Sequence, residues 1–173
     1  MPLNKYAPQV ATHRRTQSAI LEATKGLIAV TGLKKMSMIE IADASEVSRA
    51  TLYNHYRDKE SVLLALCESE LARLVELAQK APDATTALEQ LSLQVSSDSA
   101  LAAMRIQDPD QLTLALTKHD DQLWKAFAIA MTHLLGVGKS SLALRWLLGQ
   151  ALHPINAQQS RAQAEAITGI ANL

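Results

Sequence analysis

The sequence predicts an all-α protein, and three observations support this prediction. Leu and Ala dominate an apolar content of 48%, whereas aromatic residues make up only 3%, a composition that favours helices over sheets. Apolar residues recur at three- and four-residue spacing along most of the 173 residues. No segment shows the alternation of β-branched and polar residues that is typical of a strand.

The first four expected helices have local start or stop signals. Gly32 ends the first helix, and Ser37 with Glu40 forms a capping box before the second. Ser48 caps the third helix and Asp58 caps the fourth, which is long. The expected ranges are residues 16–31, 38–44, 49–55 and 59–80.

The rest of the chain predicts six more helices. The expected ranges are residues 84–96, 99–106, 109–116, 120–135, 140–152 and 157–171. Asp108 is expected to cap the helix that begins with Pro109, and Asn156 the last helix. Because no linker rich in Gly, Ser or Pro occurs, we expect a helix to join two domains, residues 1–58 and 59–173.

Charge and composition limit the partners and the location that we expect for this protein. Residues 1–60 contain nine Lys or Arg and six Asp or Glu, a net charge of +3, and the remainder carries −3. A basic N-terminal part favours a polyanionic partner. No stretch is apolar enough for a secretory signal or a membrane span. The single cysteine, Cys67, cannot form an internal disulfide, so we expect a reducing, cytoplasmic location.

Residues 38–59, MIEIADASEVSRATLYNHYRDK, carry the strongest functional pattern. A short helix, a tight break and a second short helix describe a helix-turn-helix. Ile41 and the small Ala42 are expected where the two helices cross. Leu52 and Tyr56, four residues apart, are expected to anchor the inner face of the second helix, which leaves its outer face for a partner.

The outer face of that second helix carries groups that recognise DNA. Arg49 can bridge two acceptor atoms of guanine, Asn54 can pair with adenine, and Ala50 can contact a thymine methyl group. Hydroxyl, imidazole and ammonium groups can bind phosphates and set the register. This face comprises Arg49, Ala50, Tyr53 and Asn54, with Ser48 and Thr51 beside it.

The segment Val47-Ser-Arg-Ala-Thr-Leu-Tyr-Asn-His-Tyr-Arg-Asp-Lys59, with Ile41-Ala-Asp-Ala44 before it, resembles the TetR family of bacterial transcriptional regulators. The resemblance extends from about Arg15 to Leu66 and is general beyond it. It implies an N-terminal helix-turn-helix domain and a C-terminal helical domain that binds a ligand and forms a homodimer. Glu46 stands where the family usually has glycine in the turn, and a positive φ there would be strained.

The resemblance also implies roles for individual residues. The residues expected on phosphates are Ser37, Tyr53, His55 and Lys59, and those expected near bases are Ser48, Arg49, Thr51 and Asn54. The start of the helix at Lys59 offers backbone N–H groups to a phosphate as well. Ala50, at a position that is often glycine in the family, stiffens the recognition helix.

Two sets of residues in the C-terminal domain are expected to have functions. The expected ligand-pocket residues are Met104, Leu116, Trp124, Phe127 and Met131, with Arg105, His119 and His133 as polar contacts, although a helical core would use the same apolar residues. The last two helices resemble the pair that forms a four-helix dimer interface. The expected interface residues are Leu142, Trp146, Gln150, Ala162, Ala166 and Ile170.

Sequence patterns for phosphate binding, metal binding and redox switching have weaker support. Gly136-Val-Gly-Lys-Ser140 ends like a phosphate-binding loop but lacks the first glycine and follows a helix, which favours a glycine stop and a Ser140 cap. The candidate ligands His119, Asp120, Asp121, His133 and His153 lack metal-ligand spacing. Cys67 is a candidate redox switch, although a place in the core is more usual. We therefore expect no cofactor, no metal and no enzymatic activity.

The sequence as a whole predicts a DNA-binding transcriptional regulator. We expect a ligand-responsive repressor that binds a palindromic operator as a homodimer and responds to an unknown small-molecule effector. The repressor role comes from the family resemblance. The alternative is a DNA-tethered helical protein-interaction module without a small-molecule ligand.

Overall fold

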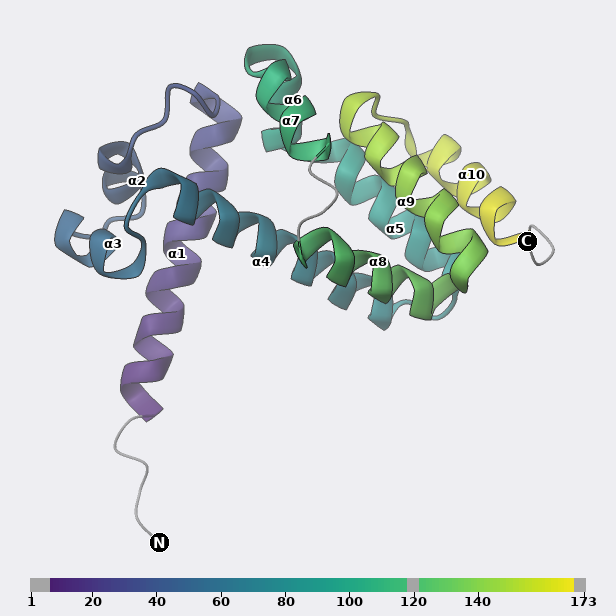
Figure 1. Cartoon of the computed structure of the whole chain (residues 1–173), viewed down its shortest axis with the longest axis horizontal. Helices are drawn as coiled ribbons and strands as arrows, with labels where there is room; N and C mark the ends of the chain where they lie inside the picture. Colours follow the sequence, from purple (N-terminus) through teal and green to yellow (C-terminus); the bar gives the residue numbers. More distant parts are fainter. Residues whose placement is uncertain (1–6, 118–121, 170–173) are drawn as a thin grey trace, which may run out of the picture.

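The computed structural model describes residues 7–117 and 122–169, and all regular structure in these ranges is helical (Figure 1). The helices are α1 (Ala7–Thr31), α2 (Met38–Ala44), α3 (Arg49–His55), α4 (Lys59–Lys80), α5 (Ala84–Ser97), α6 (Ser99–Gln107), α7 (Pro109–Thr117), α8 (Gln122–Leu135), α9 (Val137–Leu152) and α10 (Ala157–Gly169). The all-α prediction is confirmed.

Two helices begin earlier than the sequence indicated. α1 starts at Ala7 rather than at residue 16, because a helix can continue beyond the apolar repeat that packs it. α9 starts at Val137 rather than at Ser140, since Gly136 takes a φ of +81° and ends the preceding turn. The expected start of α8 at residue 120 and the expected end of α10 at residue 171 lie outside the described residues.

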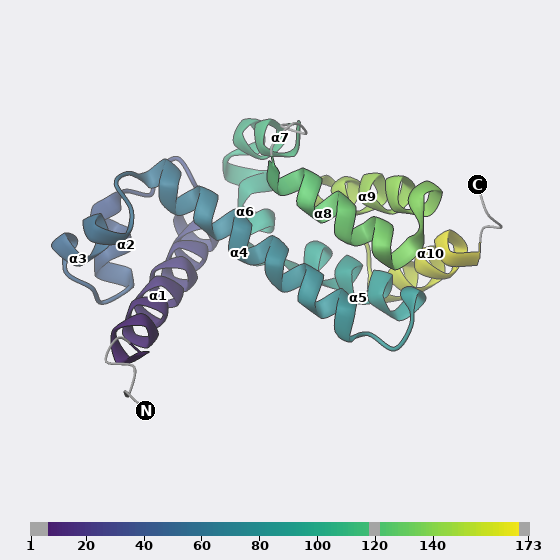
Figure 2. The ribbon, with the colours of Figure 1, turned by 60° about the horizontal axis from the view of Figure 1, so that its bottom comes forward.

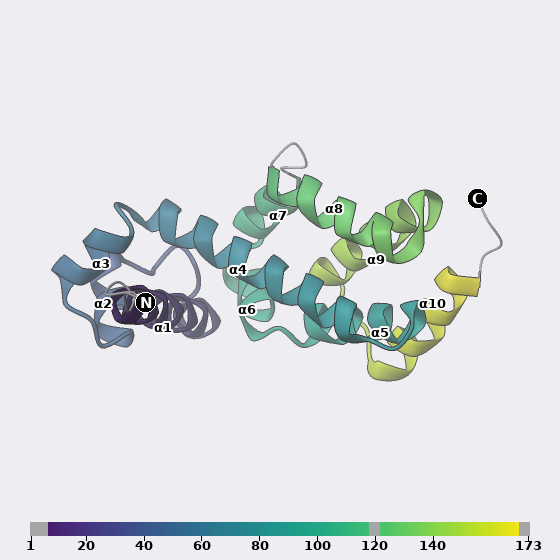
Figure 3. The same cartoon turned by 90° about the horizontal axis from the view of Figure 1, so that it is seen from below.

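α4 connects the two ends of the molecule. In Figures 1, 2 and 3 it runs from the group of α1, α2 and α3 to the group of α5, α8, α9 and α10. We call the first group the head and the second group the body. α4 packs against α1 at one end and against α5 and α8 at the other. A tilt of α4 therefore moves the head relative to the body.

The buried apolar residues form two clusters, one at each end of α4. The first cluster comprises Ile20, Leu21, Ile28, Met36, Ile41, Ala42, Leu52, Tyr56, Val62, Leu66, Ala100, Met104 and Leu112. The second comprises Ala78, Ala87, Leu88, Leu91, Phe127, Met131, Ala143, Leu147, Ala164 and Ile167. The division between them falls inside α4. α6 and α7 contribute to the first cluster, and α6 packs against α1 of the head.

The body is held by helix pairs that are distant in sequence. α10 packs mainly on α5, and α9 packs on α8 and α5. A buried polar group lies among these helices, where the side-chain amide of Gln150 forms hydrogen bonds with the hydroxyls of Ser92 (2.7 Å) and Ser96 (3.0 Å). The hydroxyl of Ser92 also lies 2.7 Å from that of Ser160. These contacts satisfy polar groups that burial would otherwise penalise.

Candidate nucleic-acid interface

α2 begins at a complete capping box. The backbone N–H of Glu40 donates to the Ser37 hydroxyl at 3.3 Å, and the N–H of Ser37 donates to the Glu40 carboxylate at 2.8 Å. Two of the N–H groups at the helix start are thus satisfied by side chains. The predicted start of α2 is confirmed.

The turn after α2 is a Schellman motif. Val47 N–H donates to Ala42 O at 3.1 Å, and Glu46 N–H donates to Asp43 O at 3.2 Å. The motif requires a residue with positive φ, and Glu46 takes a φ of +55°. This is the left-handed conformation that glycine adopts without strain, so Glu46 keeps the turn at a local cost.

The inner faces of α2 and α3 close on a small apolar core. Ile41, Ala42 and Leu52 are at most 1% exposed, and Tyr56 is 7% exposed. Tyr53, three residues before Tyr56, is 54% exposed. The predicted assignment of Tyr56 to the core and Tyr53 to the surface is confirmed, and α3 therefore has a defined outer side.

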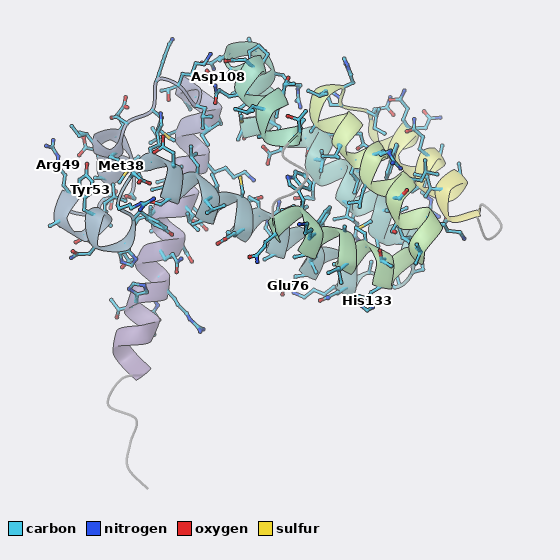
Figure 4. All side chains as sticks on the ribbon, viewed as in Figure 1. Met38, Arg49, Tyr53, Glu76, Asp108 and His133 are labelled. Carbon is cyan, nitrogen blue, oxygen red and sulfur yellow. The ribbon has the colours of Figure 1, made fainter. Side chains whose placement is uncertain are left out.

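The outer side of α3 presents a polar face to solvent. Thr51 N–H donates to the Ser48 hydroxyl at 3.0 Å, which begins the helix as predicted. Arg49 and Tyr53 project from the end of the molecule that lies away from the body (Figure 4). The exposed residues are Ser48, Arg49, Ala50, Tyr53 and Asn54, and Thr51 is half-buried. The structure thus brings all six residues of the predicted face together.

His55, at the end of α3, is half-buried against α1. Its ring stacks on that of His13, with 4.1 Å between the ring centroids. Desolvation by burial, together with the nearby charge of His13, lowers the pKa of His55 below its usual value. This contact was missed from the sequence because the expected first helix began after His13.

Lys59 is engaged with backbone groups of the head. Its ammonium donates to Leu33 O at 3.2 Å and to Met36 O at 3.0 Å. Two of its three N–H bonds are therefore directed at the loop between α1 and α2. The third remains for another acceptor, and the expected phosphate contact of Lys59 stays a prediction.

The same region carries the match to a known family. Residues 20–66 match the family model of bacterial regulatory proteins of the tetR family. Over these residues the chain is similar to TetR-family regulatory proteins. The match includes the helix-turn-helix, so it agrees with the resemblance seen in the sequence. The sequence matched none of the curated proteins with which it was compared.

Solved structures of TetR-family and other regulators show the same fold over most of the chain. SCO7518, a candidate transcriptional regulator of Streptomyces coelicolor A3(2), is 20% identical with a TM-score of 0.60, covering 90% of this chain and 99% of its own. A candidate TetR-family regulator from Rhodococcus sp. is 16% identical with a TM-score of 0.61, covering 90% and 97%. The fatty acid degradation regulator FadR of Bacillus halodurans is 21% identical with a TM-score of 0.53, covering 89% and 83%.

The five expected pocket residues fall into two separate groups in this TetR-like fold. Met104 and Leu116 pack in the first cluster, whereas Trp124, Phe127 and Met131 pack in or against the second. The structure does not bring the five together. The prediction failed because periodicity identifies buried positions and not the residues that they contact. Among the expected polar contacts, Arg105 donates to Ala151 O at 3.0 Å, His133 is exposed, and His119 lies outside the described residues.

An open groove of about 380 Å³ lies between α4 and α8. Its lining comprises Gln79, Ala126, Ile129, Ala130, His133 and Leu134. Ile129 is 59% exposed although it is apolar. Figure 4 labels His133 of α8 and Glu76 of α4 at the same edge of the body. Of the residues named from the sequence, the described lining of the groove contains only His133, and no sequence pattern pointed to this groove.

The expected dimer-interface residues differ in exposure. Gln150 is 2% exposed and lies inside the body, so it contacts Ser92 rather than offering a surface. Trp146 is half-buried, and its indole N–H donates to Gln163. Leu142, Ala162 and Ala166 are exposed, and Ile170 lies outside the described residues.

The weaker chemical patterns are now explained structurally. Helix α8 precedes Gly136, which occupies the N-cap position of α9, and the buried Ser140 hydroxyl donates to Val137 O, so the expected Ser140 cap is wrong. Cys67 is exposed, so the expectation that it packs in the core is also wrong.

Metal ligands and membrane spans can be assessed within residues 7–117 and 122–169. In these ranges no group of three or more His, Cys, Asp and Glu side chains is placed to hold a metal ion. His119, Asp120 and Asp121 lie outside the described residues. Within the same ranges, no helix combines the length and the hydropathy that crossing a bilayer requires.

Proposed function

We propose that this regulator represses transcription by binding a palindromic operator as a homodimer in the cytoplasm. The single observation that carries the proposal is the exposed polar face of α3 on a packed helix-turn-helix. A helix of this kind fits the major groove, where base edges differ in their hydrogen-bonding groups. Two heads with a fixed spacing read two half-sites.

The proposed contacts divide into base-reading and phosphate-binding residues. Ser48, Arg49, Ala50, Thr51 and Asn54 contact base edges. Ser37, Tyr53, His55 and Lys59 contact phosphates and set the register. The exposure of Arg49 and Tyr53 supports these roles. The dimer forms through the exposed sides of α9 and α10, where Leu142 is an exposed apolar residue.

A small-molecule effector controls the spacing of the heads in this proposal. Because α4 connects the head to the body, an effector that favours one setting of α4 changes the separation of the two recognition helices. A dimer with the wrong spacing binds the operator poorly. The effector shifts this equilibrium only by its difference in affinity between the two settings.

Selection from a random duplex pool by the purified protein, at near-physiological salt, tests the proposal. We expect enrichment of a near-palindrome whose half-sites are separated by about one helical turn or a multiple of it. Enrichment of a single, non-repeated site would contradict the dimeric reading. No enrichment by a folded, dimeric protein would contradict sequence-specific binding.

The open groove between α4 and α8 favours a second candidate function, a DNA-tethered protein-interaction module. The exposed Ile129 in this groove is the observation behind it. This function predicts that Ile129→Asp abolishes regulation of a reporter gene while leaving the dimer and its DNA affinity unchanged. Unchanged regulation by Ile129→Asp would contradict the module.

A further inference from the structure

The turn between α6 and α7 contacts the loop that leads into the helix-turn-helix. We call residues 106–110 the corner and residues 32–37 the entry loop. Asp108, at the corner, is 2% exposed. Its carboxylate accepts hydrogen bonds from Leu33 N–H at 2.6 Å and from Lys34 N–H at 3.4 Å. Figure 4 shows Asp108 at the end of α6 nearest to α1.

The carboxylate of Asp108 does not cap the helix that follows it. The backbone carbonyl of Asp108 accepts the first helical hydrogen bond of α7 from Leu112 N–H at 3.1 Å. The side chain is directed across to Leu33, 75 residues earlier in the sequence. A buried carboxylate is costly unless it is hydrogen-bonded, so this contact fixes both the corner and the entry loop.

The entry loop is held from a second direction by α4. The ammonium of Lys59 donates to Leu33 O and Met36 O. Leu33 therefore has its N–H bound to the corner and its carbonyl bound to α4. Gly32 takes a φ of +80°, and a Cβ on it would lie 2.7 Å from the Asp108 carboxylate. A side chain at position 32 would therefore meet the corner.

Apolar packing continues this contact into the core. Met104 of α6 and Leu112 of α7 flank Asp108 in the sequence and belong to the first cluster, as does Met36 of the entry loop. On the other side of α6, Arg105 donates to Ala151 O near the end of α9. The corner helices therefore contact both the head and the body.

We infer that Asp108 is a positioning residue for DNA binding, whose carboxylate fixes the entry loop and so sets the head relative to the body. The inference rests on the proposed function, in which a dimer reads two half-sites. In that setting, loss of the Asp108 contact lets each head vary in position while the base-reading face of α3 keeps its residues and its packing. Binding to two half-sites then weakens more than binding to one.

Three variants and the wild type test the inference. Asp108→Ala removes the carboxylate, and Asp108→Asn keeps its volume but weakens its acceptors. Asp110→Asn is the matched control, since Asp110 is exposed at the same corner and its carboxylate accepts from the exposed Lys34 at 2.8 Å and from the Gln111 amide at 3.4 Å. Thermal unfolding of each variant identifies a temperature at which all are folded.

The first readout needs no DNA. Trypsin cleaves after lysine, and the exposed Lys34 and Lys35 lie in the entry loop. Native proteins are cut where the chain opens locally. We expect Asp108→Ala to raise the rate of cleavage at these two sites by about tenfold or more, in line with the loss of a hydrogen bond to a charged group. The cleavage rate of Asp108→Asn is expected to lie between those of wild type and Asp108→Ala. The cleavage rate of Asp110→Asn is expected to stay within about twofold of wild type.

The second readout compares affinity for a selected duplex with two half-sites and for a duplex with one. We expect Asp108→Ala to reduce the ratio of these affinities by about tenfold, while affinity for the single half-site stays within about twofold. An equal loss on both duplexes would show damage to the head itself and overturn the positioning role. Unchanged trypsin cleavage would overturn it as well. A wild type that prefers no sequence would overturn the proposed function, and the positioning role with it.

Discussion

Gly32→Ala is expected to lower the free energy of unfolding by about 2–4 kcal/mol. The φ of +80° at Gly32 is a conformation that costs an L-residue about 1–2 kcal/mol. The added Cβ would lie 2.7 Å from the Asp108 carboxylate, which must then move away from Leu33 N–H, now 2.6 Å distant. Losing a hydrogen bond to a charged group costs about 1.5–3 kcal/mol. The lower entropy of unfolded alanine returns about 0.4–1 kcal/mol.

Urea unfolding at equilibrium, followed by circular dichroism, measures this change. Gly26→Ala is the matched control, because Gly26 lies within α1 and a Cβ there would meet no atom within 4 Å. The control is expected to gain about 0.5–1 kcal/mol from better helix propensity. A Gly32→Ala protein within 1 kcal/mol of wild type would refute the assigned contact between the entry loop and the corner.

Two further predictions concern the head. Lys59→Ala is expected to weaken binding to all DNA sequences alike and to reduce the salt slope by about one unit; a loss confined to one sequence would contradict a phosphate contact. Because burial and His13 lower the pKa of His55, the unfolded chain protonates His55 at a higher pH than the folded chain. The contribution of His55 to the free energy of unfolding is therefore fully present above a pH of about 6.5. It is lost as the pH falls through the folded pKa. The free energy of unfolding of His55→Gln, measured by urea unfolding between about pH 5 and pH 8, should depend less on pH than that of wild type. An unchanged pH dependence would contradict the lowered pKa of His55.

Local signals in the sequence predicted most helix boundaries. α2 and α4 begin and end where expected, because Ser37 and Asp58 satisfy the first N–H groups of each helix through neighbours within three residues. The start of α1 was missed because residues 7–15 carry no apolar repeat. The start of α9 was missed because the stop at Gly136 is followed directly by helix, with no side-chain cap to mark it.

Contacts between distant residues account for what the sequence left open. The outer face of α3 was predicted because helical spacing separates its inner from its outer residues within seven positions. Asp108 has the local pattern of a helix cap, yet its carboxylate binds Leu33, 75 residues away. Gln150 lies on an apolar helix but contacts Ser92 of α5. Neither partner is visible from periodicity, which identifies a buried side and not what covers it.

Binding of wild type and of Arg49→Ala to single-base-pair variants of the selected DNA tests whether α3 reads the operator. Arg49→Ala is expected to lose about 1–3 kcal/mol of preference at one base pair, at the equivalent position in each half-site, and to keep the other preferences. An Arg49→Ala protein that retains every base preference of the wild type would contradict the claim that the outer face of α3 reads the operator.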